Sequence, residues 1–218
     1  YIEKNGGWAT YIAGVGANDG TQYIAPGQGF FVQVADGFSS GTLAMNDNVR
    51  VHNAVPFFKS SISNLVRLQV SGNGYTDEAV IRFLPEASAA FDGQYDACKF
   101  FGDEAGAAQI YTLGSTPLCI NSLPETSAVP IGVKTNTEGV YSIFATEVND
   151  FSAISLEDTK TGIFTDLIKD SYSFSFTPGE NEQRFVLHFG PLAVNEPEKS
   201  FVNIYSNSRT IYVDLNGH

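Results

Sequence analysis

Positive charge is scarce in this sequence, and so are histidine, cysteine, methionine and tryptophan. The 218 residues include 12 Lys and Arg against 24 Asp and Glu, which gives a formal charge of −12 at pH 7. This balance would repel a polyanion such as nucleic acid, and no cluster of Lys and Arg offsets it locally. We therefore expect no nucleic-acid partner, whereas a polar neutral ligand or calcium is compatible with the acidic surface.

Long apolar runs are missing as well. No segment approaches the ~20 apolar residues that a membrane-spanning helix needs, so the sequence predicts no membrane span. The opening residues, Tyr1 to Gly7, have neither the basic start nor the apolar core of a signal peptide. If the protein is exported, we expect this sequence to be a mature form or a fragment.

The residues that most active sites need are also few. Nucleophilic catalysis requires a base beside a nucleophile, but the histidines are limited to His52, His188 and His218. Neither a GxSxG nor an HExxH motif occurs. Asp77 and Glu78 are consecutive, and consecutive residues of a strand point to opposite faces, which weakens them as a catalytic pair. The sequence predicts a protein that is not an enzyme.

The two cysteines, Cys98 and Cys119, belong to no CxxC motif and have no histidine at ligand spacing, so we expect no zinc site. Each lies in a short strand candidate, and the two could be neighbours. We predict a disulfide between them in an oxidising compartment. Two buried free thiols are the alternative.

Aromatic residues and glycine are plentiful, with 17 Phe, 10 Tyr and 21 Gly. Such a composition favours strands joined by tight turns. The clearest case is Val66–Val70 followed by Ala79–Leu84, two alternating segments separated by Asn73-Gly74. Because Asn-Gly accepts the left-handed backbone of a two-residue turn, we expect a hairpin here.

Several further segments alternate in the same way. Near the end of the chain, two of them would place aromatic ladders face to face, as the core of a β-sandwich requires. We therefore predict an all-β fold, an antiparallel, jelly-roll-like β-sandwich. The further predicted strands are Phe30–Val34, Gln109–Leu113, Tyr141–Ala145, Ala153–Leu156, Tyr172–Phe176 and Arg184–Phe189.

The predicted domain organisation has four parts. Residues 1–53 form a Gly-rich β region, which either ends a preceding module or supplies the first strands of the sandwich. Residues 54–191 form the sandwich, and residues 192–200 are polar, contain a proline and read as a linker. Residues 201–218 form a partial β hairpin, which we expect to start a domain that originally continued.

Two clusters of oxygen-bearing side chains are weak candidates for a calcium site. Asn46, Asp47 and Asn48 are consecutive, and Asp92 and Asp96 lie in a second stretch. Neither cluster follows the twelve-residue EF-hand pattern. Since Asn and Asp are also ordinary turn formers, a turn is the alternative in both places.

Three aromatic residues near the start, Trp8, Tyr11 and Tyr23, are candidates for a carbohydrate platform. Exposed rings gathered in a patch would support this interpretation. Packing against a neighbouring sheet is the alternative.

Five short motifs follow one another along the chain in a specific order. They are Ala25-Pro26-Gly27-Gln28-Gly29-Phe30-Phe31-Val32, Arg50-Val51-His52, Asn73-Gly74 with Asp77-Glu78, Ile81 and Phe83, Phe91-Asp92 with Tyr95-Asp96-Ala97 and Lys99, and Arg184-Phe185 with Leu187 and Phe189. In this order they resemble a module of large surface proteins exported by Bacteroidetes-type bacteria. The final segment, Val202 to Gly217, resembles the start of the C-terminal sorting domain of the type IX secretion system, in a truncated form. This resemblance implies an extracellular or cell-surface location and implies no chemistry.

Together these features predict a structural or adhesive module of a secreted or cell-surface protein, without cofactor except for a possible calcium ion. A carbohydrate-binding module is the alternative function. The expected partners are neighbouring domains of a longer parent chain, further copies of the chain joined by strand addition at the terminal hairpin, or carbohydrate.

Overall fold

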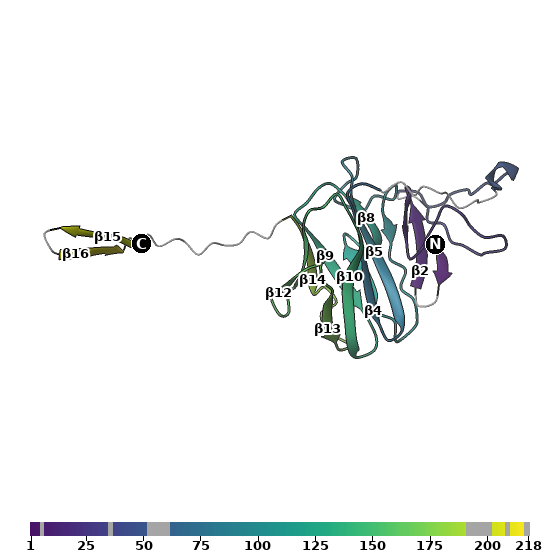
Figure 1. The fold of residues 1–218 in the computed structure, drawn as a ribbon. Helices are drawn as coiled ribbons and strands as arrows, with labels where there is room; N and C mark the ends of the chain where they lie inside the picture. The colour runs from purple at the N-terminus through teal and green to yellow at the C-terminus, as the bar shows by residue number, and fades with distance from the viewer. Residues whose placement is uncertain (5–6, 35–36, 52–61, 191–201, 208–209, 216–218) are drawn as a thin grey trace.

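The computed structural model describes residues 1–4, 7–34, 37–51, 62–190, 202–207 and 210–215 of the chain. These residues form an all-β protein, so the predicted fold class is confirmed. A large twisted sheet curls until it is nearly closed, and a smaller sheet lies beside it (Figure 1). The helical structure within the described ranges is one short 3-10 turn, η1 (Asp47–Val49). No helix in these ranges is long and apolar enough to cross a membrane.

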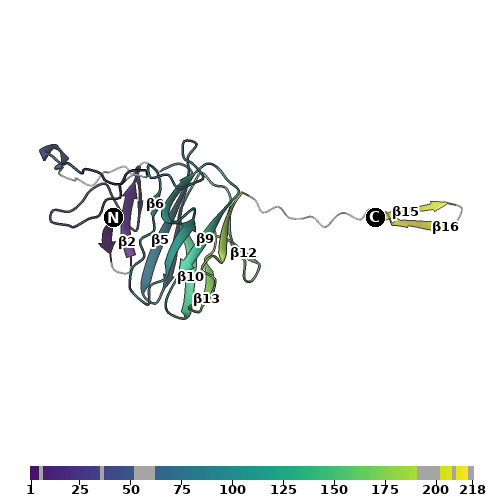
Figure 2. The same cartoon turned by 180° about the vertical axis from the view of Figure 1, so that it is seen from behind.

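The smaller sheet is antiparallel and lies at the N-terminus. It contains β1 (Ile2–Lys4), β2 (Gly7–Ile12) and β3 (Val15–Ala17), in that order. In the view from behind, β2 lies beside β6 (Ala97–Cys98) and β5 (Tyr75–Phe83) of the large sheet (Figure 2).

The large sheet contains most of the chain. Besides β5 and β6, its strands are β4 (Leu65–Gly72), β7 (Gln109–Leu113), β8 (Pro117–Leu123), β9 (Ala128–Lys134), β10 (Gly139–Asn149), β11 (Ile154–Asp158), β12 (Ile163–Asp166), β13 (Tyr172–Phe176) and β14 (Phe185–Phe189). They run in the order β12-β11-β14-β9-β7-β8-β5-β4-β10-β13, with β6 paired to β8. All neighbours are antiparallel except β5 and β8, which are parallel, so the sheet is mixed rather than purely antiparallel.

The predicted hairpin at Asn73-Gly74 is confirmed. Both residues have positive φ, 53° and 81°, and the turn joins β4 to β5 with Gly72 opposite Tyr75. This pairing places Gln69 opposite Glu78, which matters for the site described below. A two-residue turn with both residues in the left-handed region matches the twist of the flanking strands.

The main core lies between the two curved halves of the large sheet. The predicted aromatic ladders meet there, since the rings of Phe174 on β13 and Phe185 on β14 are 4.8 Å apart and nearly edge to face. Aliphatic residues of the neighbouring strands fill the rest of this core. A second, smaller core joins β3 to the large sheet through Val15, Ala17 and residues such as Val80 and Ile120.

The predicted strand Phe30–Val34 is wrong. This segment has no regular strand structure, and its described backbone pairing is with Tyr1, whose carbonyl and amino groups bond Phe31 at 2.8 and 2.9 Å. One paired residue is too little to form a ladder, and the side chains from Phe31 to Val34 are exposed rather than half-buried.

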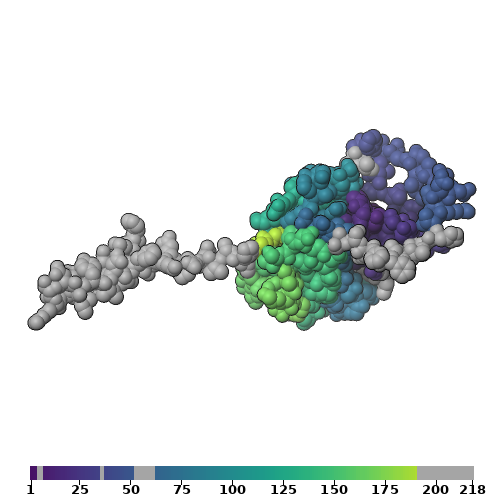
Figure 3. All heavy atoms as spheres, turned by 45° about the horizontal axis from the view of Figure 1, so that its top comes forward, coloured from purple at the N-terminus to yellow at the C-terminus, as the bar shows by residue number. Residues whose placement is uncertain are grey.

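The region from Tyr23 to Val51, here called the apolar segment, carries most of the exposed large apolar side chains among the described residues. Figure 3 shows it, in blue, as an open loop that stands out from the body of the protein. The apolar members with exposed side chains are Tyr23, Ile24, Phe31, Val32, Val34, Phe38, Leu43, Met45, Val49 and Val51. An apolar surface of this extent is typical of an interaction site.

At the C-terminal end, β15 (Val202–Asn207) and β16 (Thr210–Leu215) form a separate two-stranded antiparallel sheet. The expected terminal hairpin is therefore present. The linker predicted at residues 192–200 lies outside the described residues, as do His52 and His218.

Candidate functional site

Two tight turns shape the region where the small sheet meets the large one. Ala13 and Gly14, with φ of 46° and 86°, join β2 to β3, and Asn18 and Asp19 also have positive φ. The second turn folds the chain back so closely that Gly20 lies directly against the backbone of Thr10 on β2. The following residues are thereby held alongside β2.

A buried ion pair lies beneath this region. Asp77 on β5 contacts the ammonium group of Lys99, and each side chain is only 2% exposed. The same carboxylate accepts hydrogen bonds from the Ile110 N–H at 2.7 Å and from the Asn18 side-chain amide at 2.9 Å. Asn18 also donates to the Trp8 carbonyl, so this cluster connects the small sheet to β5 and β7.

A second cluster lies next to it and centres on Arg67 of β4. Its guanidinium donates to Glu78 at 2.5 Å, to Glu147 at 3.2 Å and to the carbonyl of Gly16 on β3 at 2.5 Å. Gln69 donates to the other oxygen of Glu78 at 3.3 Å. Two carboxylates thus share one guanidinium, and the cluster has a net negative charge.

The Arg67 cluster forms the floor of a groove of 820 Å³ between the small sheet and the outer face of β4, β5 and β10, here called the polar groove. Tyr11 and Tyr23 line its other side, and their side chains are 38% and 37% exposed. The remaining lining includes Asp19, Thr21, Gln22, Gln69, Thr146 and Glu147.

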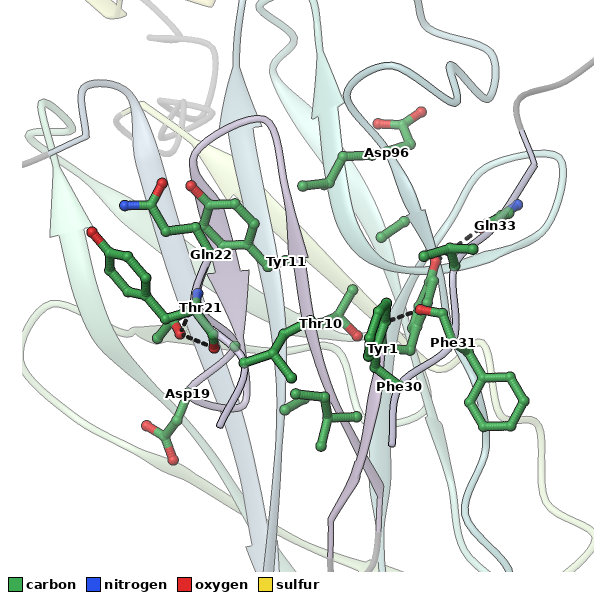
Figure 4. A pocket seen from close by; sticks show the side chains of 18 of the residues that line it. Tyr1, Thr10, Tyr11, Asp19, Thr21, Gln22, Phe30, Phe31, Gln33 and Asp96 are labelled. Atoms are coloured by element: carbon green, nitrogen blue, oxygen red, sulfur yellow. Dashed lines mark hydrogen bonds between the residues drawn. The ribbon is translucent and has the colours of Figure 1, made fainter. Parts of the chain in front are cut away.

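A second hollow, of 420 Å³, is lined by the same two tyrosines and is here called the aromatic pocket. Figure 4 shows Tyr11, Thr21 and Gln22 on one side of it and Tyr1, Phe30 and Phe31 on the other. The Tyr1 hydroxyl donates to Gln33 at 2.9 Å, and the Tyr1 ring stacks on Phe100 at 4.2 Å.

Asp96, one of the calcium candidates, also lines the aromatic pocket. Burial raises the pKa of its carboxyl, although the N–H groups of Asp92 and Ser122 donate to it at 2.8 and 2.7 Å. Both oxygens are therefore used to hold the turn before β6 against β8. The Asp92 carboxylate accepts from the Gln94 N–H at 2.9 Å, a bond that lies within the same turn.

The other calcium candidates are exposed. Asn46 caps η1 by accepting from the Asn48 N–H at 3.0 Å, and Asp47 lies 3.9 Å from Arg50. In the described parts of the chain, the structure brings together no group of three or more His, Cys, Asp or Glu side chains that could hold a metal ion. Asn46, Asp92 and Asp96 instead accept backbone hydrogen bonds in turns, which was the alternative interpretation of the two clusters.

The predicted disulfide is not present in the structure, where Cys98 and Cys119 are free thiols. Cys98 pairs with Leu118 across a bulge, and its sulfur accepts from Gln33 at 3.5 Å. The Cys119 thiol instead donates to the Cys98 carbonyl at 3.3 Å. Burial raises the pKa of the Cys119 thiol, so it behaves as a core side chain.

The three candidate aromatics do not form one platform. Tyr11 and Tyr23 both line the polar groove and the aromatic pocket. Trp8 packs edge-on against Phe31 and Phe100, with ring centres 5.5 and 5.6 Å apart. Because Trp8 and Tyr11 stand an odd number of residues apart on β2, they point to opposite faces of that strand.

A second buried ion pair lies where the two ends of the large sheet approach each other. Asp158 on β11 is bonded by both Nε and Nη2 of Arg184, at 2.7 and 2.6 Å, and by the Tyr172 hydroxyl at 2.6 Å. Arg184 also donates to the Ser175 carbonyl of β13 at 2.9 Å. Burial opposes ionisation of Asp158, but these hydrogen bonds outweigh it and lower the pKa of Asp158 to about 2.

The remaining described histidine also has a partner. His188 on β14 lies 2.7 Å from Glu157 and packs against Phe164. No nucleophilic side chain is recorded within hydrogen-bonding distance of its ring in the described ranges. His188 therefore links β14 to β11 through Glu157, and the described residues place no nucleophile beside it.

Sequence reasoning did not identify Arg67, Lys99 or Asn18 as members of a site. A partial signal existed, because Asp77, Glu78 and Lys99 belong to the motifs that carry the family resemblance. Their meeting in space depends on the parallel pairing of β5 with β8, which alternation alone does not predict.

Comparison with known proteins gives one family. No curated protein and no solved structure matches the chain. Residues 2–189 match the family described as "Domain of unknown function (DUF8693)", whose description assigns no activity. Since this match covers most of the 218 residues, the chain belongs to that family.

Proposed function

We propose that this protein is a non-catalytic structural module of a secreted or cell-surface protein, and that copies of it associate through the apolar segment together with strand addition at the hairpin β15–β16. The observation that carries the proposal is the use of the charged motif residues. Asp77, Lys99 and Arg184 are all buried in ion pairs that join strands, with their hydrogen bonds made inside the protein. Such residues hold layers together.

The electrostatics of these pairs support a structural role. A catalytic acid or base needs access to a substrate, but Asp77 and Lys99 are each 2% exposed. Removing one partner of a buried pair leaves an unpaired charge in the interior, which typically costs about 3–5 kcal/mol. Residues with this role should therefore control stability.

The resemblance of the motifs supports export to the cell surface by type IX secretion. The apolar segment supports an adhesive role, because its exposed side chains, Phe38 at 72% above all, would be covered in an assembly. The partner is a second copy of the chain. The hairpin β15–β16 forms a two-stranded sheet of its own, and such a hairpin is only marginally stable in water. A strand from a second copy that pairs with its edge would extend and stabilise it.

A double-mutant cycle tests the structural role of the motif charges. We expect Lys99→Met to destabilise the protein by about 3–5 kcal/mol, because the Asp77 carboxylate is left buried and unpaired. The double variant Lys99→Met with Asp77→Asn should recover part of this loss, since both charges are removed. Urea unfolding followed by the fluorescence of the single tryptophan, Trp8, measures both effects.

The matched control is Lys169→Met, which breaks the exposed pair with Asp166. An exposed pair contributes ~0–1 kcal/mol, so this variant should unfold almost as the wild type does. If Lys99→Met were as stable as the control, the motif charges would not be structural and the proposal would fail.

A further inference from the structure

We propose that the polar groove binds a neutral carbohydrate, with Tyr11 and Tyr23 forming the rim and the Arg67 cluster forming the floor. This binding goes beyond the structural function proposed above; it shares Tyr23 with the apolar segment but otherwise uses different residues. The volume of the groove, 820 Å³, lies within the range of about 300–1,000 Å³ that is usual for small-ligand sites.

The rim offers two rings to a sugar. Tyr11 and Tyr23 line both hollows, and more than a third of the surface of each residue is exposed, so a ligand can reach their rings. A tyrosine ring is apolar on its faces and polar at its hydroxyl, so it packs on the C–H face of a pyranose while its edge bonds a hydroxyl group. The close contact of Gly20 with the β2 backbone holds the segment that carries Tyr23 beside Tyr11.

The floor offers fixed hydrogen-bonding groups. Arg67, Glu78 and Glu147 come from three neighbouring strands, β4, β5 and β10, and they already hold one another in place at 2.5 and 3.2 Å. Glu78 accepts hydrogen bonds from the Asn18 N–H, Arg67 and Gln69, which use three of the about four lone-pair sites of a carboxylate, so a ligand hydroxyl can still donate to it. Groups held in advance by the sheet lose little entropy when a ligand binds.

The charge of the groove selects a neutral ligand. Two carboxylates face one guanidinium on the floor, and Asp19 adds a third carboxylate to the lining. An anionic sugar such as a uronic acid or a sialic acid would be repelled. A neutral sugar supplies only hydroxyl donors and acceptors, which this floor can satisfy.

The two hollows share their wall, which suggests the length of the ligand. Tyr11, Tyr23 and the residues from Asp19 to Gln22 line both the polar groove and the aromatic pocket. A chain of two or more sugar residues could therefore extend from one hollow to the other across the tyrosines. The site that the sequence predicted at Trp8, Tyr11 and Tyr23 is thus revised, with Trp8 outside it.

The test is a glycan array that contains neutral and acidic oligosaccharides, followed by calorimetric titration of the strongest neutral binder. We expect binding to neutral glycans only. The variant Tyr11→Ala with Tyr23→Ala should weaken this binding by about tenfold or more. Phe164→Ala is the matched control, because it removes an equally exposed ring from β12, away from the groove.

A second variant, Thr146→Trp, keeps the test decisive if the tyrosine variant fails to fold. It fills the groove from β10 and should abolish binding while both tyrosines are intact. The proposal is overturned if no neutral glycan binds, or if binding survives in the folded variants. Neither result affects the structural proposal, which is measured by unfolding at Lys99 and by self-association.

Discussion

At the scale of single residues, this protein places charges in its interior and pairs them there. Asp158 and Arg184 are 0% and 6% exposed at the side chain, and they close the approach between β11, β13 and β14. A buried ion pair gains stability only where additional hydrogen bonds satisfy both groups. The Tyr172 hydroxyl, the Lys160 N–H and the Ser175 carbonyl supply these bonds.

The lowered pKa of Asp158 predicts a specific dependence of stability on pH. Its pKa falls from the ordinary 3.8 to about 2 on folding, so the unfolded chain binds the proton more tightly. The carboxylate therefore contributes about 2 kcal/mol above pH ~4, and this contribution is lost as the pH falls toward about 2. Urea unfolding of the wild type and of Asp158→Asn, at neutral pH and at about pH 2.5, measures it.

The wild type should exceed Asp158→Asn in stability at neutral pH, and the difference should shrink in acid. An unchanged difference at both pH values would show that Asp158 is not ionised through its pair with Arg184.

At the scale of elements, close backbone contact fixes the small sheet. A methyl group added at Gly20 would lie 1.9 Å from the Thr10 carbonyl oxygen, and backbone atoms cannot move aside as a flexible side chain can. The turn at Asn18 and Asp19 depends on this contact. The rim of the polar groove depends on it as well.

Gly20→Ala should therefore destabilise the protein by about 1–3 kcal/mol, as overpacking usually does. Gly29→Ala is the control, because nothing lies within 4 Å of a methyl group added there. Thermal unfolding of both variants gives the comparison. Equal melting temperatures would contradict the described packing of the second turn against β2.

Much of the element pattern could be predicted from the sequence, and the hairpin at Asn73-Gly74 shows why. Its register follows from the turn, so the contact of Gln69 with Glu78 was within reach of sequence reasoning. β9 was missed because it contains Pro130, and proline in a strand paired on both sides argues against a strand.

The rest of the site could not be predicted, because it depends on distant segments. Glu147 reaches Arg67 only because β10 has a bulge between Ala145 and Glu147, which changes the face of the following residues. Asn18 reaches Asp77 through a turn in a different sheet. Alternation predicts which residues share a face of one strand but not which remote strand lies opposite.

At the scale of the whole molecule, polarity is divided between two regions. The interior of the large sheet contains the apolar core and the buried ion pairs Asp77–Lys99 and Asp158–Arg184. The apolar segment, in contrast, exposes its large apolar side chains to solvent. With a formal charge of −12, the chains repel one another at long range, so association requires a specific apolar contact.

Light scattering of the purified chain tests the proposed assembly most directly. We predict oligomers for residues 1–218, and their loss on deletion of residues 193–218 or in the variant Phe38→Ser, Leu43→Ser, Met45→Ser. The matched control, Val140→Ser, Ile163→Ser, Ile168→Ser, removes exposed apolar side chains elsewhere and should still associate. If the full-length chain were monomeric, so that it did not differ from the two altered forms, this result would contradict the account.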